Sequence, residues 1–154
     1  MKILYPTDEN VKNIVELEII RLGNDADLNH IDVSNITNMN NLFMHSQFNG
    51  DISKWNVSNV TSFRNTFMYS KFNRDISNWN VTCCDDFGNM FAFSLFNRDL
   101  NNWNILTNAW MHGIFSECPY TGPFAEKKYL NGALIGNQFS DEYNVAYNFK
   151  KLNF

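Results

Sequence analysis

Cysteine is scarce in this chain, and its few thiols are badly placed for disulfide bonds. There are three cysteines in 154 residues, and two of them, Cys83 and Cys84, are adjacent. An odd number with adjacent members fits no disulfide framework of a small secreted domain. The usage instead suits a reducing compartment.

Long apolar runs and a secretory leader are also missing. No stretch approaches the about 18 apolar residues that a membrane-spanning helix needs. The first residues, MKILYPTDENVKN, offer only a short apolar stretch before Pro6, which does not fit a signal peptide. We therefore expect no membrane span and a cytoplasmic protein, or a surface-exposed or secreted one if a leader was removed.

A basic excess is absent as well. The formal net charge is -4, whereas binding to nucleic acid or to an anionic membrane needs clustered positive charge. The sequence also has no glycine-rich phosphate loop, no acid–base pair and no nucleophile with a placed partner. We therefore expect no nucleic-acid partner, no cofactor and no enzymatic activity.

Aromatic residues, in contrast, are abundant and fall in register. They make up 16% of the chain, with 14 Phe and 4 Trp, too much apolar surface for a disordered protein. Aspartate recurs at a spacing of 24, at Asp27, Asp51, Asp75 and Asp99. This register defines four repeats, numbered 1 to 4, over residues 27–50, 51–74, 75–98 and 99–122.

Several positions of the repeat are apolar or small in every copy. Position 5 holds Ile31, Trp55, Trp79 and Trp103; position 17 holds Phe43, Phe67, Phe91 and Phe115; position 20 holds Ser46, Ser70, Ser94 and Cys118; position 22 holds Phe48, Phe72, Phe96 and Tyr120. One repeat cannot bury these side chains by itself. Stacked neighbours can, so these positions are predicted to form a shared core.

Each repeat also carries signals for a short strand and a short helix. In DISKWNVS the apolar residues alternate with polar ones, which is typical of a strand. Thr37, Thr61 or Asp85 then stands as an N-cap before two apolar residues spaced by four. The predicted fold class is an α/β repeat, a leucine-rich-repeat-like solenoid of four strand-plus-short-helix repeats.

The ends of such a stack need caps. Residues 8–22 are predicted to form an amphipathic helix, because Thr7 can act as its N-cap and Gly23 as its C-terminal stop. Residues 123–154 break the period but keep apolar side chains. The predicted organisation is an N-terminal capping helix in 1–26, the four repeats in 27–122, and a C-terminal cap in 123–154.

The pattern FNxDISxWNVSNVTxFxxxF, preceded by GNDADLNHIDVSNIT, resembles the BspA-like leucine-rich-repeat family of bacterial surface proteins, over about residues 7–122. The resemblance implies a right-handed solenoid, a bacterial or phage protein, binding of other proteins and no catalytic centre. Repeat 4 departs from the pattern, because NILTNAWMHGIF lacks the Ser-Asn-Val-Thr phrase.

Metal binding has weak support in the sequence. The cysteines lack the CxxC spacing of a zinc site, and we expect Cys84 and Cys118 in the core and Cys83 at the surface. The three histidines fall at variable positions and are expected at the surface. The recurrent aspartates could be read as a calcium site, but capping of turns is the commoner use of aspartate, so no metal is predicted.

Asparagine also recurs, at position 6 in Asn56, Asn80 and Asn104, and at position 23 in Asn49, Asn73 and Asn97. Side-chain amides can bond to the neighbouring repeat on either side. Both rows are therefore predicted to be structural ladders.

A variable apolar stripe is the first candidate for binding. Positions 18 and 19 follow the recurrent Phe and should point outward, yet they are rich in apolar side chains. Such a stripe often marks a protein contact. The predicted protein-binding residues are Met44, His45, Met68, Tyr69, Phe93, Leu95 and Trp110. The alternative is that the C-terminal segment or a second copy of the chain covers the stripe, which would make a homo-oligomer.

The second candidate is a polar, nearly uncharged face opposite the stripe. Its outward residues include Lys54, Asn56, Asn78, Asn80, Asn102 and Asn104. Small polar side chains are seldom energetic hot spots, so this face ranks below the stripe.

Three functions remain as hypotheses. The first is a non-catalytic protein-interaction module, an intracellular binder or inhibitor that blocks another protein sterically. The second is a secreted or surface-exposed adhesion module. The third, a metal-dependent or thiol enzyme, would be revived by a metal retained through purification.

Overall fold

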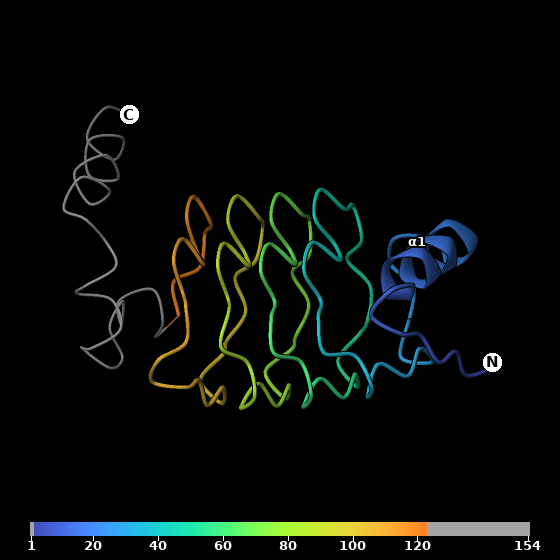
Figure 1. Ribbon diagram of the computed structural model, residues 1–154. Helices are drawn as coiled ribbons and strands as arrows, with labels where there is room; N and C mark the ends of the chain where they lie inside the picture. The colour runs from blue at the N-terminus through green and yellow to red at the C-terminus, as the bar shows by residue number, and fades with distance from the viewer. Residues whose placement is uncertain (1, 123–154) are drawn as a thin grey trace.

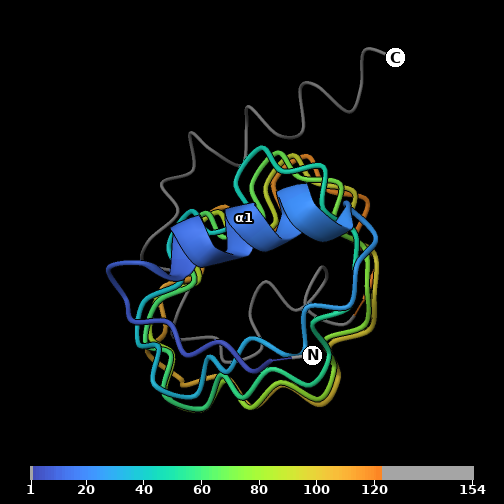
Figure 2. The same cartoon turned by 90° about the vertical axis from the view of Figure 1, so that its right-hand side faces the viewer.

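The computed structural model describes residues 2–122. Figure 1 shows one helix followed by successive turns of chain that lie side by side. In Figure 2, which looks along this row, the outlines of the turns superimpose and the helix lies across the first of them. The predicted C-terminal cap in 123–154 lies outside the described residues.

The helix α1 spans Val11–Leu22 and begins three residues later than predicted. Asn10 takes the N-cap position, and the backbone N–H groups of Asn10 and Val11 both donate to the Thr7 carbonyl in a tight turn before the helix. The C-terminal end is as predicted, because Gly23 adopts a positive φ of 94° and donates its N–H to the Ile19 carbonyl. No helix in residues 2–122 has the length and apolar character needed to cross a membrane.

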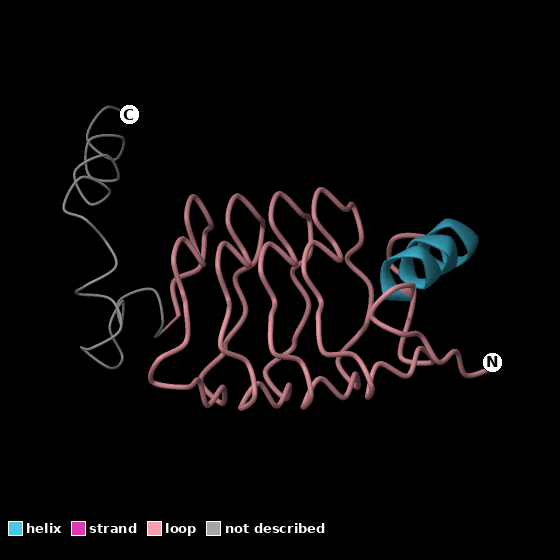
Figure 3. Ribbon diagram, viewed as in Figure 1, coloured by secondary structure: helices cyan, strands magenta, loops and turns pink. Residues whose placement is uncertain are grey.

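The predicted α/β leucine-rich-repeat solenoid, with a strand and a short helix in each repeat, is wrong. Within residues 2–122 the only helix is α1, and strand pairing is limited to isolated parallel bridges, such as Asn38 with Ser62. Loops and turns form the rest of this part of the chain, with no sheet (Figure 3). Because the described repeats contain neither strands nor helices, the chain is not a leucine-rich-repeat solenoid.

Tight turns replace the predicted strands and helices because of where the backbone N–H groups point. In the first half of the repeat, N–H groups donate three residues back, as from Trp55 to the Ile52 carbonyl at 3.1 Å. In the second half, alternate N–H groups donate to the next repeat, as from Phe67 to the Met90 carbonyl at 2.8 Å. An α-helix needs consecutive N–H groups bonded four residues back, so this alternation excludes one.

Two predicted polar features are confirmed. Each recurrent aspartate caps a turn: the carboxylates of Asp27, Asp51, Asp75 and Asp99 each accept the backbone N–H two residues on, at 2.8 Å. The amides at position 23 form the predicted ladder, since the Asn49 Oδ1 accepts the N–H of Asn73 at 2.8 Å and the Asn73 Oδ1 accepts that of Asn97 at 2.9 Å.

The core is built of aromatic columns, and its residues are largely those predicted. Phe43, Phe67 and Phe91 are fully buried, with ring centroids 5.2 and 5.5 Å apart in successive repeats. The Trp55 and Trp79 indoles stack at 6.5 Å and are also buried. Each buried indole N–H donates to a carbonyl of the preceding repeat, so the columns bury apolar surface without leaving polar groups unpaired.

A partly buried contact centred on Glu18 links α1 to repeat 1. Glu18, only 9% exposed, accepts hydrogen bonds from Arg21 and from the His30 Nε2 at 2.7 Å. The Arg21 hydrogen bond is the largest cause lowering the pKa of Glu18 to about 2, and the His30 bond adds to it against the effect of burial. The prediction that His30 lies at the surface is therefore wrong, because its ring is held against α1.

Glu18→Gln is expected to lower the free energy of unfolding by about 2 kcal/mol at about pH 7, because the variant loses both charge-assisted bonds. The folded pKa is depressed, so the Glu18 contribution is fully present above the unfolded value of about 4.3 and is lost as the pH falls towards about 2. Denaturant melts across this range should show a smaller acid-induced loss in the variant. Glu16→Gln, exposed on the same helix, serves as control, and equal effects of the two substitutions would contradict the ionic contact.

Candidate functional site

An exposed column of three rings runs along one edge of the row of turns. His45 stacks on Tyr69 with ring centroids 4.9 Å apart and planes 7° from parallel, and Tyr69 stacks on Phe93 at 4.7 Å and 10°. Tyr69 and Phe93 are each 44% exposed, and His45 is exposed as well. We call these three residues, which share position 19 of the repeat, the aromatic ladder.

Each ring of the ladder sits on a left-handed backbone. The φ angles are 61° at His45, 57° at Tyr69 and 56° at Phe93, and Glu117 at the same position of repeat 4 has 52°. The turn is closed by the N–H of position 20, which donates to the carbonyl of position 17, as from Ser70 to Phe67 at 3.1 Å. Positive φ at the third residue of such a turn favours Gly or Asn.

The neighbouring repeats hold this conformation in place. The N–H of Tyr69 donates to the Ala92 carbonyl at 2.9 Å, and those of His45 and Phe93 donate in the same way to Met68 and Ser116. A left-handed conformation costs a residue with a side chain roughly 1–2 kcal/mol. The interturn bonds and the ring stacking, at about 0.5–1.5 kcal/mol per aromatic pair, offset that cost.

A second position of the repeat has the same left-handed backbone but carries no aromatic ring. Position 15 also has positive φ in all four repeats, and it is occupied by Asn41, Asn65, Asn89 and Gly113. These are the residue types that tolerate the left-handed region. The aromatic side chains at position 19 are therefore not there to suit the backbone, and their rings need another explanation.

Ring stacking decides which part of the ladder is available to a ligand. The faces of the middle ring, Tyr69, are covered by His45 and Phe93. What the ladder presents to solvent is a row of ring edges, together with the exposed side chains of Met44 and Leu95, at 36% and 55%. A row of ring edges flanked by Met44 and Leu95 suits packing by apolar side chains rather than a ring lying flat against Tyr69.

The predicted stripe thus divides into two parts. Met44, His45, Met68, Tyr69, Phe93 and Leu95 lie on or beside the ladder, with Met68 half-buried. Trp110 lies elsewhere: it pairs in a bridge with Asp86, and its indole is 5.7 Å from the His112 ring. The reason is its place in the repeat, since Trp110 stands at position 12, well before the turn that carries the ladder.

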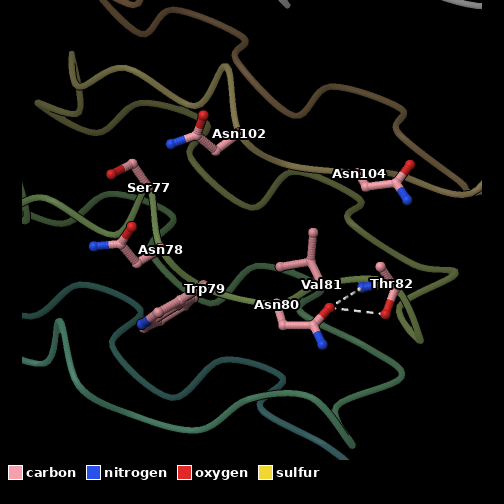
Figure 4. Close-up of a pocket in the computed structure, with 8 residues that line it drawn as sticks. All are labelled: Ser77, Asn78, Trp79, Asn80, Val81, Thr82, Asn102 and Asn104. Atoms are coloured by element: carbon pink, nitrogen blue, oxygen red, sulfur yellow. Dashed lines mark hydrogen bonds between the residues drawn. The ribbon is translucent and has the colours of Figure 1, made fainter.

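The second predicted face is exposed as expected, and it contains a pocket. Lys54, Asn56, Asn78, Asn80, Asn102 and Asn104 are all exposed. The pocket lies between repeats 3 and 4, has a volume of about 390 Å³ and includes four of these asparagines in its lining (Figure 4). The Asn80 Oδ1 accepts from the N–H of Thr82 at 3.2 Å and from its hydroxyl at 2.8 Å, so the predicted ladder of position 6 amides does not form here.

Thiol and metal chemistry finds little support in the described residues. Cys84 is buried as predicted, and burial raises the pKa of its thiol to about 12, which keeps it protonated. Cys83 is exposed as predicted, whereas Cys118 is half-buried rather than part of the inner core. Residues 2–122 contain no cluster of three or more His, Cys, Asp or Glu side chains able to hold a metal ion.

The positive φ at positions 15 and 19 was missed at the level of sequence. The signal was present at position 15, where Asn, Asn, Asn and Gly occupy one place in four repeats. It was absent at position 19, because His, Tyr, Phe and Glu give no hint of a left-handed backbone.

Comparison with known proteins gives a family but no function. A family model described as "Mycoplasma protein of unknown function, DUF285" matches residues 11–127. The searches of curated proteins and of solved structures found no match.

Proposed function

This chain belongs to the DUF285 family of Mycoplasma proteins of unknown function, and we propose that it is a non-catalytic protein that binds an apolar segment of another protein through the aromatic ladder. The observation that carries the proposal is the choice of residues at position 19. Three repeats place an aromatic ring on a left-handed backbone and leave it exposed to solvent.

The backbone cost at position 19 favours a binding role for the exposed rings. Asparagine or glycine at position 19 would remove most of the backbone cost, as position 15 demonstrates. Stacking of the exposed rings offsets part of that cost, and aromatic side chains become hot spots when a partner covers them. Met44 and Leu95 extend the ladder sideways, so that a partner segment would bury a continuous apolar strip.

The chemistry of the surface defines the class of partner. The ladder and its apolar neighbours carry no carboxylate or ammonium group, so the proposed partner contributes apolar side chains rather than a charged motif. Binding in this way acts by occupying a partner's surface and blocking it sterically.

Tyr69→Gly is expected to abolish partner binding while changing the free energy of unfolding by less than about 1 kcal/mol. The variant loses two ring stacks but relieves the left-handed backbone, and the two effects oppose each other. Tyr69→Ala loses the same stacks without that relief and should be less stable than Tyr69→Gly by about 1 kcal/mol. Denaturant melts of both variants measure the difference.

Binding is measured by capture of partners on the immobilised protein from a lysate of the native host, followed by mass spectrometry and titration of the purified partner. Leu106→Ser, which removes an exposed apolar side chain away from the ladder, is the matched control and should bind normally. A partner retained by Tyr69→Gly and lost by Leu106→Ser would overturn the proposal. So would equal stability of Tyr69→Gly and Tyr69→Ala, because the strained backbone would then be absent.

A further inference from the structure

The pocket between repeats 3 and 4 is polar but carries no charge. Its lining combines the carboxamides of Asn78, Asn80, Asn102 and Asn104 with the hydroxyl-bearing residues Ser77 and Thr82, and none of its residues is ionised at neutral pH. The volume of about 390 Å³ falls within the range of about 300–1,000 Å³ that is usual for small-molecule sites. A site of this composition would not attract a phosphate, a carboxylate or a cation by charge.

Many asparagines of residues 2–122 are committed to hydrogen bonds within the fold: the Asn29 Oδ1 accepts the N–H of Lys54 at 2.9 Å, and the Asn59 Nδ2 donates to the Ser34 carbonyl at 2.8 Å. Asn78, Asn102 and Asn104 make no side-chain hydrogen bond within residues 2–122. These three uncommitted amides line the same pocket.

The fourth asparagine, Asn80, uses only its amide oxygen in hydrogen bonds within the fold. The Asn80 Oδ1 accepts from Thr82, which leaves the Nδ2 free to donate to a ligand. In Figure 4 Asn78 and Asn102 lie on one side of the pocket, and Asn80 and Asn104 lie on the other. The four amides come from repeats 3 and 4, so a ligand that lies across the pocket would contact both repeats.

We propose that this pocket binds a neutral saccharide. Sugar hydroxyls each donate and accept hydrogen bonds, and a carboxamide offers both functions in one plane. The lining also includes Val81 and Trp79, but these side chains are only 1% and 3% exposed and offer a sugar ring little apolar surface.

The indole of Trp79 donates no hydrogen bond to the ligand. Its N–H is committed to the Ile52 carbonyl at 3.2 Å, and the side chain is only 3% exposed. Polar recognition therefore rests on the four amides. A peptide amide could also pair with a carboxamide, but it offers one donor and one acceptor, whereas the lining provides the amide groups of four asparagines.

The test is a titration followed by two-dimensional NMR of the asparagine side-chain NH₂ groups in the full chain. The probes are glucose, galactose, mannose, N-acetylglucosamine and maltose, with N-acetylglycinamide as the peptide-amide probe. At least one sugar should produce saturable shifts at Asn78, Asn102 and Asn104 and leave the interturn amides of Asn49 and Asn73 unchanged. Absence of any such shift, or shifts with N-acetylglycinamide alone, would overturn the proposal.

The double variant Asn102→Ala/Asn104→Ala should weaken sugar binding by about tenfold or more and keep the melting temperature of the parent, because neither amide bonds to a described residue. Asn56→Ala is the matched control. It removes a position 6 amide that accepts the Ser58 N–H at 3.2 Å and lies outside the pocket, so its sugar affinity should equal that of the parent. Unchanged affinity in the double variant would also overturn the proposal.

Discussion

Trp79→Ala is expected to lower the free energy of unfolding by about 3–5 kcal/mol, the largest effect of any substitution considered for this chain. The indole is 3% exposed and stacks on Trp55 at 6.5 Å and on Phe63 at 5.7 Å. Alanine leaves a cavity between two repeats and removes one of the two donors to the Ile52 carbonyl, the indole N–H at 3.2 Å, so that only the Trp55 N–H at 3.1 Å remains. Both losses fall in the interior, where neighbouring rings are too tightly stacked to collapse into the space.

Two further variants separate the contributions in the same denaturant melts. Trp79→Phe keeps a ring in the column and removes the N–H, so it should cost about 1–3 kcal/mol. Trp110→Ala makes the same truncation at a half-buried indole and should cost less than Trp79→Ala. Near-parental stability of Trp79→Ala would show that the indole is not packed between the repeats.

Gly50→Ala is expected to cost about 3 kcal/mol, although it adds a single methyl group. The new Cβ would collide with the Ala26 carbonyl oxygen and would lie 2.6 Å from the Phe48 ring. Neither group can move away easily. The Ala26 oxygen accepts the Asp51 N–H at 2.9 Å, and Phe48 is fully buried in the aromatic core.

The chain supplies a matched control at the same position of the next repeat. Position 24 is glycine in repeat 1 but Arg74 in repeat 2. Arg74→Ala loses two exposed interactions, a hydrogen bond from the Arg74 Nε to the Asn49 carbonyl at 2.6 Å and an ion pair with Asp25 at 3.8 Å, and should cost less than about 1 kcal/mol. Thermal or denaturant melts in which the two alanine variants match would contradict the close approach at Gly50.

Burial and turn capping could be predicted from the sequence because they depend on one residue at a time. A recurrent Trp or Phe every 24 residues has to be buried, and Trp55, Trp79 and Phe67 are. A recurrent Asp with Ser two residues on caps a turn, and Asp51 and Asp75 do so. The exposure of Tyr69 and Phe93 was predicted in the same way, from their position in the repeat.

The secondary structure could not be predicted in this way, because it depends on where each backbone N–H finds its acceptor. Thr61 and Phe63 suggested a helix start, yet the N–H of Thr61 bonds to the Thr37 carbonyl in the preceding repeat and that of Phe63 to Asp86 in the following one. Local propensity gives no information on acceptors 23 or 24 residues away, and tertiary pairing overrides it.

The candidate site was predicted in part for a related reason. The positions expected to point outward correctly identified Met44, Tyr69 and Leu95 as exposed. The prediction also placed Trp110 in the same stripe, although Trp110 pairs in a bridge with Asp86. The predicted amide ladder at position 6 failed because Asn80 bonds to its own turn. Side chains with several possible partners cannot be assigned by periodicity alone.

The regular separation of interturn contacts also shapes how the chain folds. The bond between Asn73 and Asn49 joins residues 24 apart, and that between Asn97 and Asn73 joins residues the same distance apart. Loop-closure entropy grows only with the logarithm of loop length, so docking each pair of neighbours meets nearly the same entropic barrier. No single distant contact has to form first, and the initiation of folding is spread over every boundary between neighbouring turns.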